Sequence, residues 1–174
     1  MNENQTSMLK QTMTFGAIIA LILVVYGILL YILDLTFNKV LGYVQYVVLF
    51  IGIFLATKTY RDKSLGGFIS YGKALGFGVL ISVFVGIVTI FFGYIMMRYI
   101  DPGLIDKYLV IAEERLQNSR FIPEDQIPDA LERSKRMMTA VWTIPVGVIT
   151  FTFFGFIISL ITSAFVKKEP NPIA

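Results

Sequence analysis

The chain has 174 residues, of which 56% are hydrophobic and only 16% are charged, whereas soluble domains carry about 25% charged residues. It contains neither cysteine nor histidine, which excludes disulfide frameworks, thiolate chemistry, cysteine-ligated metal sites and any catalytic triad built on histidine. The formal net charge of +3 comes with no basic stripe that would indicate nucleic-acid binding.

The first apolar run covers residues 15–33 and holds no charged residue. A run of about 18 or more apolar residues is typical of a transmembrane helix, so we predict a span over 14–34. A signal peptide has a shorter apolar stretch, followed by a small-residue cleavage site. The sequence LDLTFNK follows here instead, and we expect a retained helix, with a cleaved signal peptide as the alternative.

Three further apolar runs predict spans over 40–57, 73–98 and 140–166. The short connection over 34–39 makes the first two spans an antiparallel hairpin. The expected fold is all-α: a polytopic membrane protein with four transmembrane helices, an amphipathic helical segment before the last of them, and one domain over 1–174. Membrane lipids are the first partners that this fold implies.

Residues 66–86, GGFISYGKALGFGVLISVFVG, are rich in glycine and contain Lys73. Residues 67–73 follow the phosphate-binding pattern G-x-x-x-x-G-K-[ST] as far as the lysine, but Ala74 stands where the pattern requires a hydroxyl. Small residues at four-residue steps share a helix face and let membrane helices approach closely, so we predict a packing role. The alternative is that glycine is simply commoner in membrane helices. The residues assigned to helix packing are Gly72, Gly76, Gly78, Ser82, Gly86, Gly147, Gly155, Ser159 and Ser163.

The polar segment over 99–138 begins with the helix breaker Asp-Pro-Gly at 101–103. Apolar residues at 105, 109, 112 and 116 then predict an amphipathic helix to about residue 118, lying on the bilayer surface or on its neighbour. Pro128 suits the first turn of a second helix, with ion pairs at 129–133 and 132–136. That helix can run straight into the fourth span.

No group of residues predicts an active site. The neighbouring acids at 113–114 and 124–125 do not face each other on a helix, and the charged residues lie at or beyond the span ends, unlike those of ion-coupled transporters. Hydroxyls inside the spans, such as Thr143, Thr150, Thr152, Ser159 and Thr162, are expected to bond the carbonyl four residues earlier. We therefore expect no enzymatic activity, no cofactor and no metal, although carboxylate chemistry with Mg²⁺ stays open.

Orientation is predicted from the short loops, because cytoplasmic loops are enriched in Lys and Arg. The loop over 58–73 holds four basic residues and the loop over 34–39 holds only Lys39. Both termini are therefore expected in the cytoplasm. The basic residues of 99–138 nearly balance this count, so the side that holds this segment stays open.

Three strings, FISYGKALGFG at 68–78, YIDP at 99–102 and GFIISLITSAFVKKE at 155–169, resemble a bacterial membrane family, domain-of-unknown-function family 4199. The resemblance covers nearly the whole chain and implies a four-helix protein of the bacterial inner membrane, with a polar segment before the last helix. It carries over no site residues. It implies one candidate partner, a membrane-associated glycosyltransferase of family two.

Three functions fit these observations. The first is a non-enzymatic assembly or accessory subunit that packs with itself or with a membrane partner. The second is a small-solute or lipid carrier that acts as an oligomer, with a polar cavity lined by Gln45, Thr150 and Ser159. The third, implied by the resemblance, is an accessory subunit of a polyprenyl-phosphate glycosyltransferase.

Overall fold

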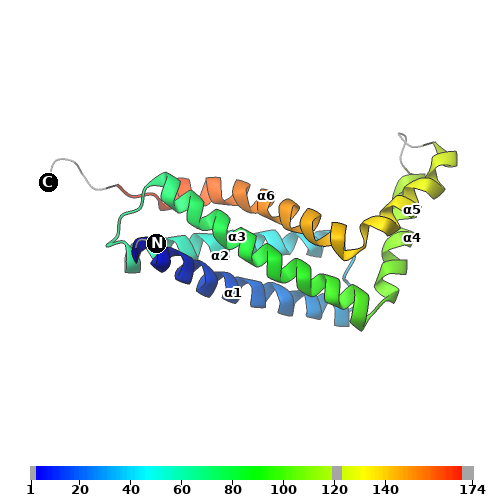
Figure 1. Cartoon of the computed structure of the whole chain (residues 1–174), viewed down its shortest axis with the longest axis horizontal. Coiled ribbons are helices and arrows are strands. Elements are labelled where there is room, and N and C mark those ends of the chain that lie inside the picture. The colour runs from blue at the N-terminus through cyan, green and yellow to red at the C-terminus, as the bar shows by residue number, and fades with distance from the viewer. Residues whose placement is uncertain (1–2, 119–122, 170–174) are drawn as a thin grey trace. The chain divides into compact units, whose positions relative to one another are not determined.

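The structure is a computed structural model that describes residues 3–118 and 123–169, and over these residues it is all-α (Figure 1). The α-helices are α1 (Glu3–Ile32), α2 (Lys39–Ser64), α3 (Tyr71–Ile95), α4 (Gly103–Gln117), α5 (Ile127–Met137) and α6 (Ala140–Val166). A π-helical turn, η1 (Met96–Ile100), extends α3, and a 3₁₀ turn, η2 (Glu124–Gln126), precedes α5.

Four helices are long and apolar enough to cross a membrane, over Met8–Ile32, Lys39–Ser64, Tyr71–Ile100 and Ala140–Val166. The helices α4 and α5 lie between the third and fourth of these in the chain. The predicted all-α fold with four candidate spans is thereby confirmed, and the chain is a multi-pass membrane protein. The glycine-rich stretch from Gly72 to Gly86 is helical throughout, so no open phosphate-binding loop forms there.

The hairpin between α1 and α2 is closed by specific caps. Asp34 adopts a left-handed conformation with φ 55°, and the amide of Leu35 donates to the carbonyl of Leu30 at 2.8 Å, which is the Schellman ending of a helix. The Asn38 side chain then accepts hydrogen bonds from the amides of Val40 and Leu41. Two of the four free amides at the start of α2 are satisfied in this way.

The loop between α2 and α3 begins later than the predicted end of the second span, because α2 continues to Ser64. Gly66 and Gly67 then take positive φ values of 64° and 87°, a conformation that side chains with a Cβ rarely adopt. The next residues extend, and Ile69 exchanges two main-chain hydrogen bonds with Lys168, of 2.9 and 3.0 Å. This antiparallel bridge joins the loop to the segment that follows α6.

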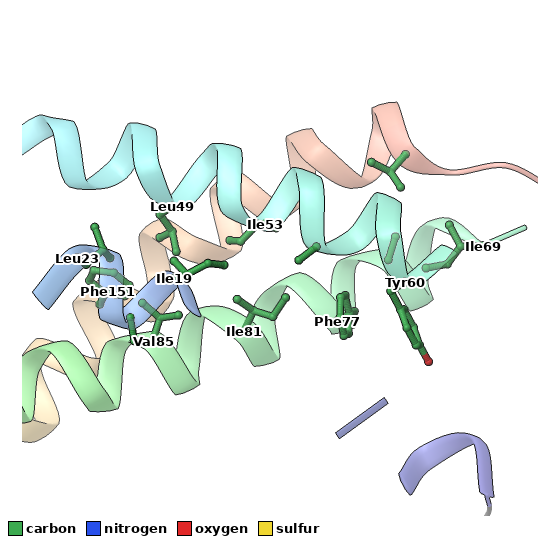
Figure 2. Close-up of a cluster of buried hydrophobic side chains, with 14 residues drawn as sticks. Ile19, Leu23, Leu49, Ile53, Tyr60, Ile69, Phe77, Ile81, Val85 and Phe151 are labelled. Carbon is green, nitrogen blue, oxygen red and sulfur yellow. The ribbon is translucent and has the colours of Figure 1, made fainter. Parts of the chain in front are cut away.

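The chain divides into two compact units, and the first comprises residues 3–89 with 148–169. Its core draws on all four spans: Ile19, Ile53, Ile81 and Phe151 are among the buried side chains that Figure 2 shows gathered between the helices. Residues of α1 pack on α2, since Ile19 lies against Gly52. Such a core, between apolar helices whose outer surfaces remain exposed, is typical of packed membrane helices.

Aromatic stacking marks one end of this core, where Tyr60 of α2 lies on Phe77 of α3. Their ring centroids are 4.4 Å apart, and both side chains are buried. Near the other end, Tyr46 of α2 stacks on Phe151 and tilts against Phe154 of α6. Offset aromatic pairs of this kind each add roughly 0.5–1.5 kcal/mol beyond their area burial.

The second unit comprises residues 90–147, in which α4 and α5 lie side by side (Figure 1). Pro128 sits in the first turn of α5, as predicted. The ion pair between Glu132 and Arg136 forms at 3.3 Å. The other predicted pair, Asp129 with Arg133, is not formed in the part of the chain that the structure describes.

The prediction that α5 continues straight into the fourth span is wrong. The helix α5 ends at Met137 and α6 starts at Ala140. Met138 and Thr139 separate them, and the Thr139 carbonyl accepts the amides of Trp142 and Thr143 at the start of α6. The Thr143 hydroxyl donates to the carbonyl of Met137 at 2.9 Å, which satisfies one of the free carbonyls at the end of α5.

Candidate functional site

The small residues of α3 and α6 meet along one seam inside the first unit. A Cβ atom added at Gly78 would lie 2.6 Å from Oγ of Ser159, and one added at Gly155 would overlap the side chain of Ser82. A Cβ at Gly86 would lie 3.2 Å from the ring of Phe151. Glycine therefore sets the distance between these two helices at three successive levels, because any larger residue would push them apart.

The other residues assigned to packing lie elsewhere. Ser163 is buried on α6, and Gly147 lies against Ile90 inside the second unit, where an added Cβ would come within 2.9 Å. By contrast, a Cβ atom added at Gly76 would have only the end of the Met8 side chain within 4 Å, at 3.9 Å. A Cβ atom added at Gly72 would have no neighbour within 4 Å. The seam thus takes five of the nine residues, those at 78, 82, 86, 155 and 159.

The hydroxyls of the spans do not follow the expected pattern on α6. Ser82 of α3 donates to the carbonyl of Gly78, four residues earlier, at 2.9 Å, but Thr162 donates to Ser159, three residues earlier. Ser159 is buried without a hydrogen bond among the described residues. Its hydroxyl lies at the position that a Cβ atom on Gly78 would approach.

Thr150 also differs from the expectation, because it is exposed and makes no hydrogen bond to any described residue. Thr150 and Ser159 are nine residues apart, which at about 100° per residue places them on opposite faces of α6. Ser159 is buried on the inner face. The polar cavity expected between Gln45, Thr150 and Ser159 is therefore not formed by one face of this helix.

The outer face of α6 is a continuous exposed stripe, which we call the α6 outer face. It carries Thr150, Phe153, Ile157, Ile161 and Phe165 at helical spacing, and the two phenylalanines are 59% and 74% exposed. One step of three residues followed by three steps of four keeps these side chains on one side of the helix. The sequence pattern did not reveal this face, because α6 is apolar all round.

A cluster of polar contacts joins the C-terminal ends of α2 and α6 and the start of α3 in the first unit. Arg61 donates to the carbonyl of Val166 at 2.9 Å and pairs with Asp62 at 2.7 Å. Tyr71 donates to the carbonyl of Leu160 at 3.2 Å, and the Lys168 ammonium lies 5.5 Å from the centre of the Phe68 ring. Sequence reasoning assigned Arg61 only to orientation, since no local pattern indicates a contact 105 residues away.

The second unit contains a cavity of about 340 Å³. Its walls come from the end of α3, from η1, α4 and α5, and from the start of α6, and they include Tyr94, Arg98, Ile105, Tyr108, Met138 and Trp142. Tyr94 and Trp142 lie near span ends, where amphipathic rings concentrate at the level of the headgroups. Their positions in the sequence are typical of a bilayer boundary and do not indicate a cavity.

No group of three or more Asp or Glu side chains that could hold a metal ion occurs within 3–118 and 123–169. A family model described as "Protein of unknown function (DUF4199)" matches residues 14–168. Neither the curated proteins nor the solved structures contain a match to the chain.

Proposed function

We propose that this chain, which belongs to the DUF4199 family, is a non-enzymatic assembly or accessory subunit. It carries four candidate membrane spans. It binds another transmembrane helix, from a second copy or from a membrane partner, through the α6 outer face. The observation that carries this proposal is the Thr150 hydroxyl, which is exposed in the middle of a span and lacks a partner in the described chain.

A hydroxyl that faces lipid without a hydrogen bond costs roughly 1–3 kcal/mol. Within membranes, Thr and Ser hydroxyls are commonly bonded across a helix–helix interface, for about 0.6–2 kcal/mol each. The exposed rings of Phe153 and Phe165 lie on the same face, on the C-terminal side of this hydroxyl. A second helix seated here would cover apolar rings and supply the missing carbonyl or hydroxyl partner.

The small-residue seam between α3 and α6 cannot be the surface that binds a partner helix, which leaves the exposed faces of the spans. Gly78, Ser82, Gly155 and Ser159 already pack against one another between α3 and α6. Their backbones are therefore committed inside the chain and leave no room for another helix. A partner has to bind at a face that the chain leaves exposed, and the α6 outer face presents Thr150 as an exposed polar group in mid-span.

Site-directed crosslinking tests the proposal cleanly, because the chain contains no cysteine. We would introduce Thr150→Cys and Phe153→Cys separately, and attach a photoreactive maleimide in native membranes. Leu21→Cys serves as the matched control, since Leu21 is 64% exposed in the middle of α1. We expect a discrete adduct from the two α6 positions and none from the α1 position.

The mass of the adduct then shows whether the bound helix belongs to a second copy of the chain or to a different protein. Twice the mass of the chain indicates a second copy, and a different mass indicates a partner, including the glycosyltransferase that the family resemblance implies. The same adducts from α1 and α6, or no protein adduct from either helix, would contradict the proposal. The first result would mean that the contacts of the α6 outer face are not selective, and the second that lipid covers it.

A further inference from the structure

We infer that the cavity within residues 90–147 binds an anionic phospholipid, with an acyl chain among its apolar walls and the phosphate on the guanidinium of Arg98. The inference is independent of the α6 outer face, because the cavity lies wholly within the second unit. It rests on three observations: the nature of the walls, the unpaired charge of Arg98, and the depth at which the lining residues stand.

The walls suit a hydrocarbon chain. Ile105 of α4, Met97 of η1, and Met138 between α5 and α6 line the cavity. Its volume of about 340 Å³ falls within the range of small-molecule sites, roughly 300–1,000 Å³, which are mostly apolar with few polar groups. Methionine side chains are flexible and polarisable, and they adapt to chains of different shape.

The hydroxyls of Ser134 and Thr143 are already engaged within the chain. Ser134 donates to the carbonyl of Ala130 at 2.9 Å, and Thr143 donates to the carbonyl of Met137. Arg98, in contrast, lines the cavity without a hydrogen bond or ion pair to any described residue. Its guanidinium therefore offers all of its donors to a ligand, and its planar fork matches the oxygens of a phosphate.

The nearest acid along the chain does not neutralise Arg98. The Asp101 side chain accepts the amide of Gly103 at 3.0 Å, which caps the start of α4. The Tyr94 and Tyr108 hydroxyls are further donors at the cavity without a partner among residues 3–118 and 123–169. The polar groups that remain for a ligand are thus one cation and two hydroxyls, which select an anion rich in acceptors.

The depth of the lining residues selects a lipid over a free anion. Arg98 stands near the end of the span Tyr71–Ile100, and Trp142 stands near the start of the span Ala140–Val166. Tryptophan, tyrosine and arginine at span ends lie at the level of the lipid headgroups. A phospholipid presents a phosphate at that level with an acyl chain attached, whereas inorganic phosphate would leave the apolar walls unfilled.

Trp142 is the sole tryptophan of the chain. It lines the cavity and is 57% exposed, so its fluorescence reports on lipid bound in the cavity and on lipid around it, and the shape of the titration separates the two. We would titrate the full-length protein, in micelles of a non-ionic detergent, with phosphatidylglycerol that carries bromine on its acyl chains. Bromine quenches tryptophan on contact. Saturable quenching is expected from a bound lipid, whereas quenching that rises linearly without saturation would show that Trp142 is only bathed by lipid and would overturn the inference.

Substitutions test the role of the charge. Arg98→Gln should weaken the lipid affinity about tenfold, as expected for a charge-assisted hydrogen bond. Arg98→Lys should restore part of it, because the charge returns without the planar fork. Arg115→Gln on α4 removes the same charge outside the cavity, and it should change the affinity by less than about twofold, because Arg115 does not line the cavity. Circular dichroism of each variant checks that the helices remain folded.

Further results would overturn the inference. These are equal losses for Arg98→Gln and Arg115→Gln, an Arg98→Lys variant no better than Arg98→Gln, and displacement of the lipid by excess inorganic phosphate. The last result would assign the site to a free anion. Quenching that depends on protein concentration, and not on lipid, would assign Trp142 to a contact with a second copy.

Discussion

The guanidinium of Arg61 in α2 donates a 2.9 Å hydrogen bond to the main-chain carbonyl of Val166, the last residue of α6. The last carbonyls of a helix have no intrahelical donor, and they carry the negative end of its dipole. The Arg61 guanidinium supplies a donor to the Val166 carbonyl and a positive charge at the negative end of the dipole. The same guanidinium pairs with Asp62 through Nε and Nη2, so one side chain fixes the end of the last span to the second.

Replacing Arg61 should loosen the end of α6. Arg61→Gln removes a hydrogen bond from a charged donor, so we expect main-chain amides over 163–168 to exchange with solvent about tenfold faster. Hydrogen exchange followed by mass spectrometry measures this. Lys63→Gln is the matched control, because Lys63 is exposed and pairs with no described residue. Equal exchange rates in the two variants would show that the Arg61 contact does not hold the helix end.

Because Ser82 and Gly155 are in contact, enlarging one residue should lower the unfolding free energy, and shrinking the other should restore it. Gly155→Ala places a Cβ against the Ser82 side chain, and overpacking of this kind costs roughly 1–3 kcal/mol of unfolding free energy. The double variant with Ser82→Gly clears the space and should recover at least half of that loss. Unfolding in mixed detergent micelles, followed by circular dichroism, measures the coupling energy of the two sites.

A glycine in open space provides the control for this cycle. Gly27 of α1 has no atom within 4 Å of an added Cβ, so Gly27→Ala should raise the unfolding free energy by roughly 0.5–1 kcal/mol through helix propensity. If Gly155→Ala were as stable as Gly27→Ala, the close approach of α3 and α6 at this level would not exist.

The bridge between Ile69 and Lys168 predicts that the α2–α3 loop depends on the segment after α6. Lys168→Pro removes the amide that donates to the Ile69 carbonyl at 3.0 Å. The loss of one such bond should speed chymotryptic cleavage after Phe68, which is exposed in the loop over 65–70, roughly threefold. Glu169→Pro removes an amide outside the bridge and should leave cleavage unchanged. Similar cleavage of both variants would show that the bridge does not order the loop.

Membrane orientation is predicted from the basic loop and is measurable because the chain lacks cysteine. Single cysteines at Ser64→Cys and Gln117→Cys occupy exposed positions on opposite sides of the third span in the chain. With both termini in the cytoplasm, an impermeant maleimide should label Gln117→Cys in intact cells, and should label Ser64→Cys only after lysis. The reverse pattern would invert the topology.

The local features of the fold were predictable because they depend on short stretches of sequence. Spans follow from apolar length, and the helix over Gly103–Gln117 follows from its periodicity and from the breaker before it. Pro128 marked the start of α5 for the same reason. The break at Thr139 was missed, since the residues over 135–142 contain neither glycine nor proline to mark an end.

The packing residues were only partly separable by sequence. Gly72 and Gly78 lie on the same helix, yet Gly72 faces open space and Gly78 lies against Ser159. Four-residue spacing defines two faces here, because Gly72 and Gly78 lie about 120° apart around the helix, but it cannot say which of these faces the neighbouring helix meets. The cavity of the second unit was missed because five elements contribute its walls, and no single stretch of sequence contains them.

Apolar length and loop charge are properties that each segment carries by itself, so the amino-acid sequence alone determined four membrane spans and a charged helical insertion before the last of them. Contacts between distant segments are decided by how each helix is rotated and where it crosses its neighbours. Only the tertiary structure could therefore show that Arg61 closes the end of α6, that α3 and α6 meet through their small residues, and that Thr150 is left facing outward.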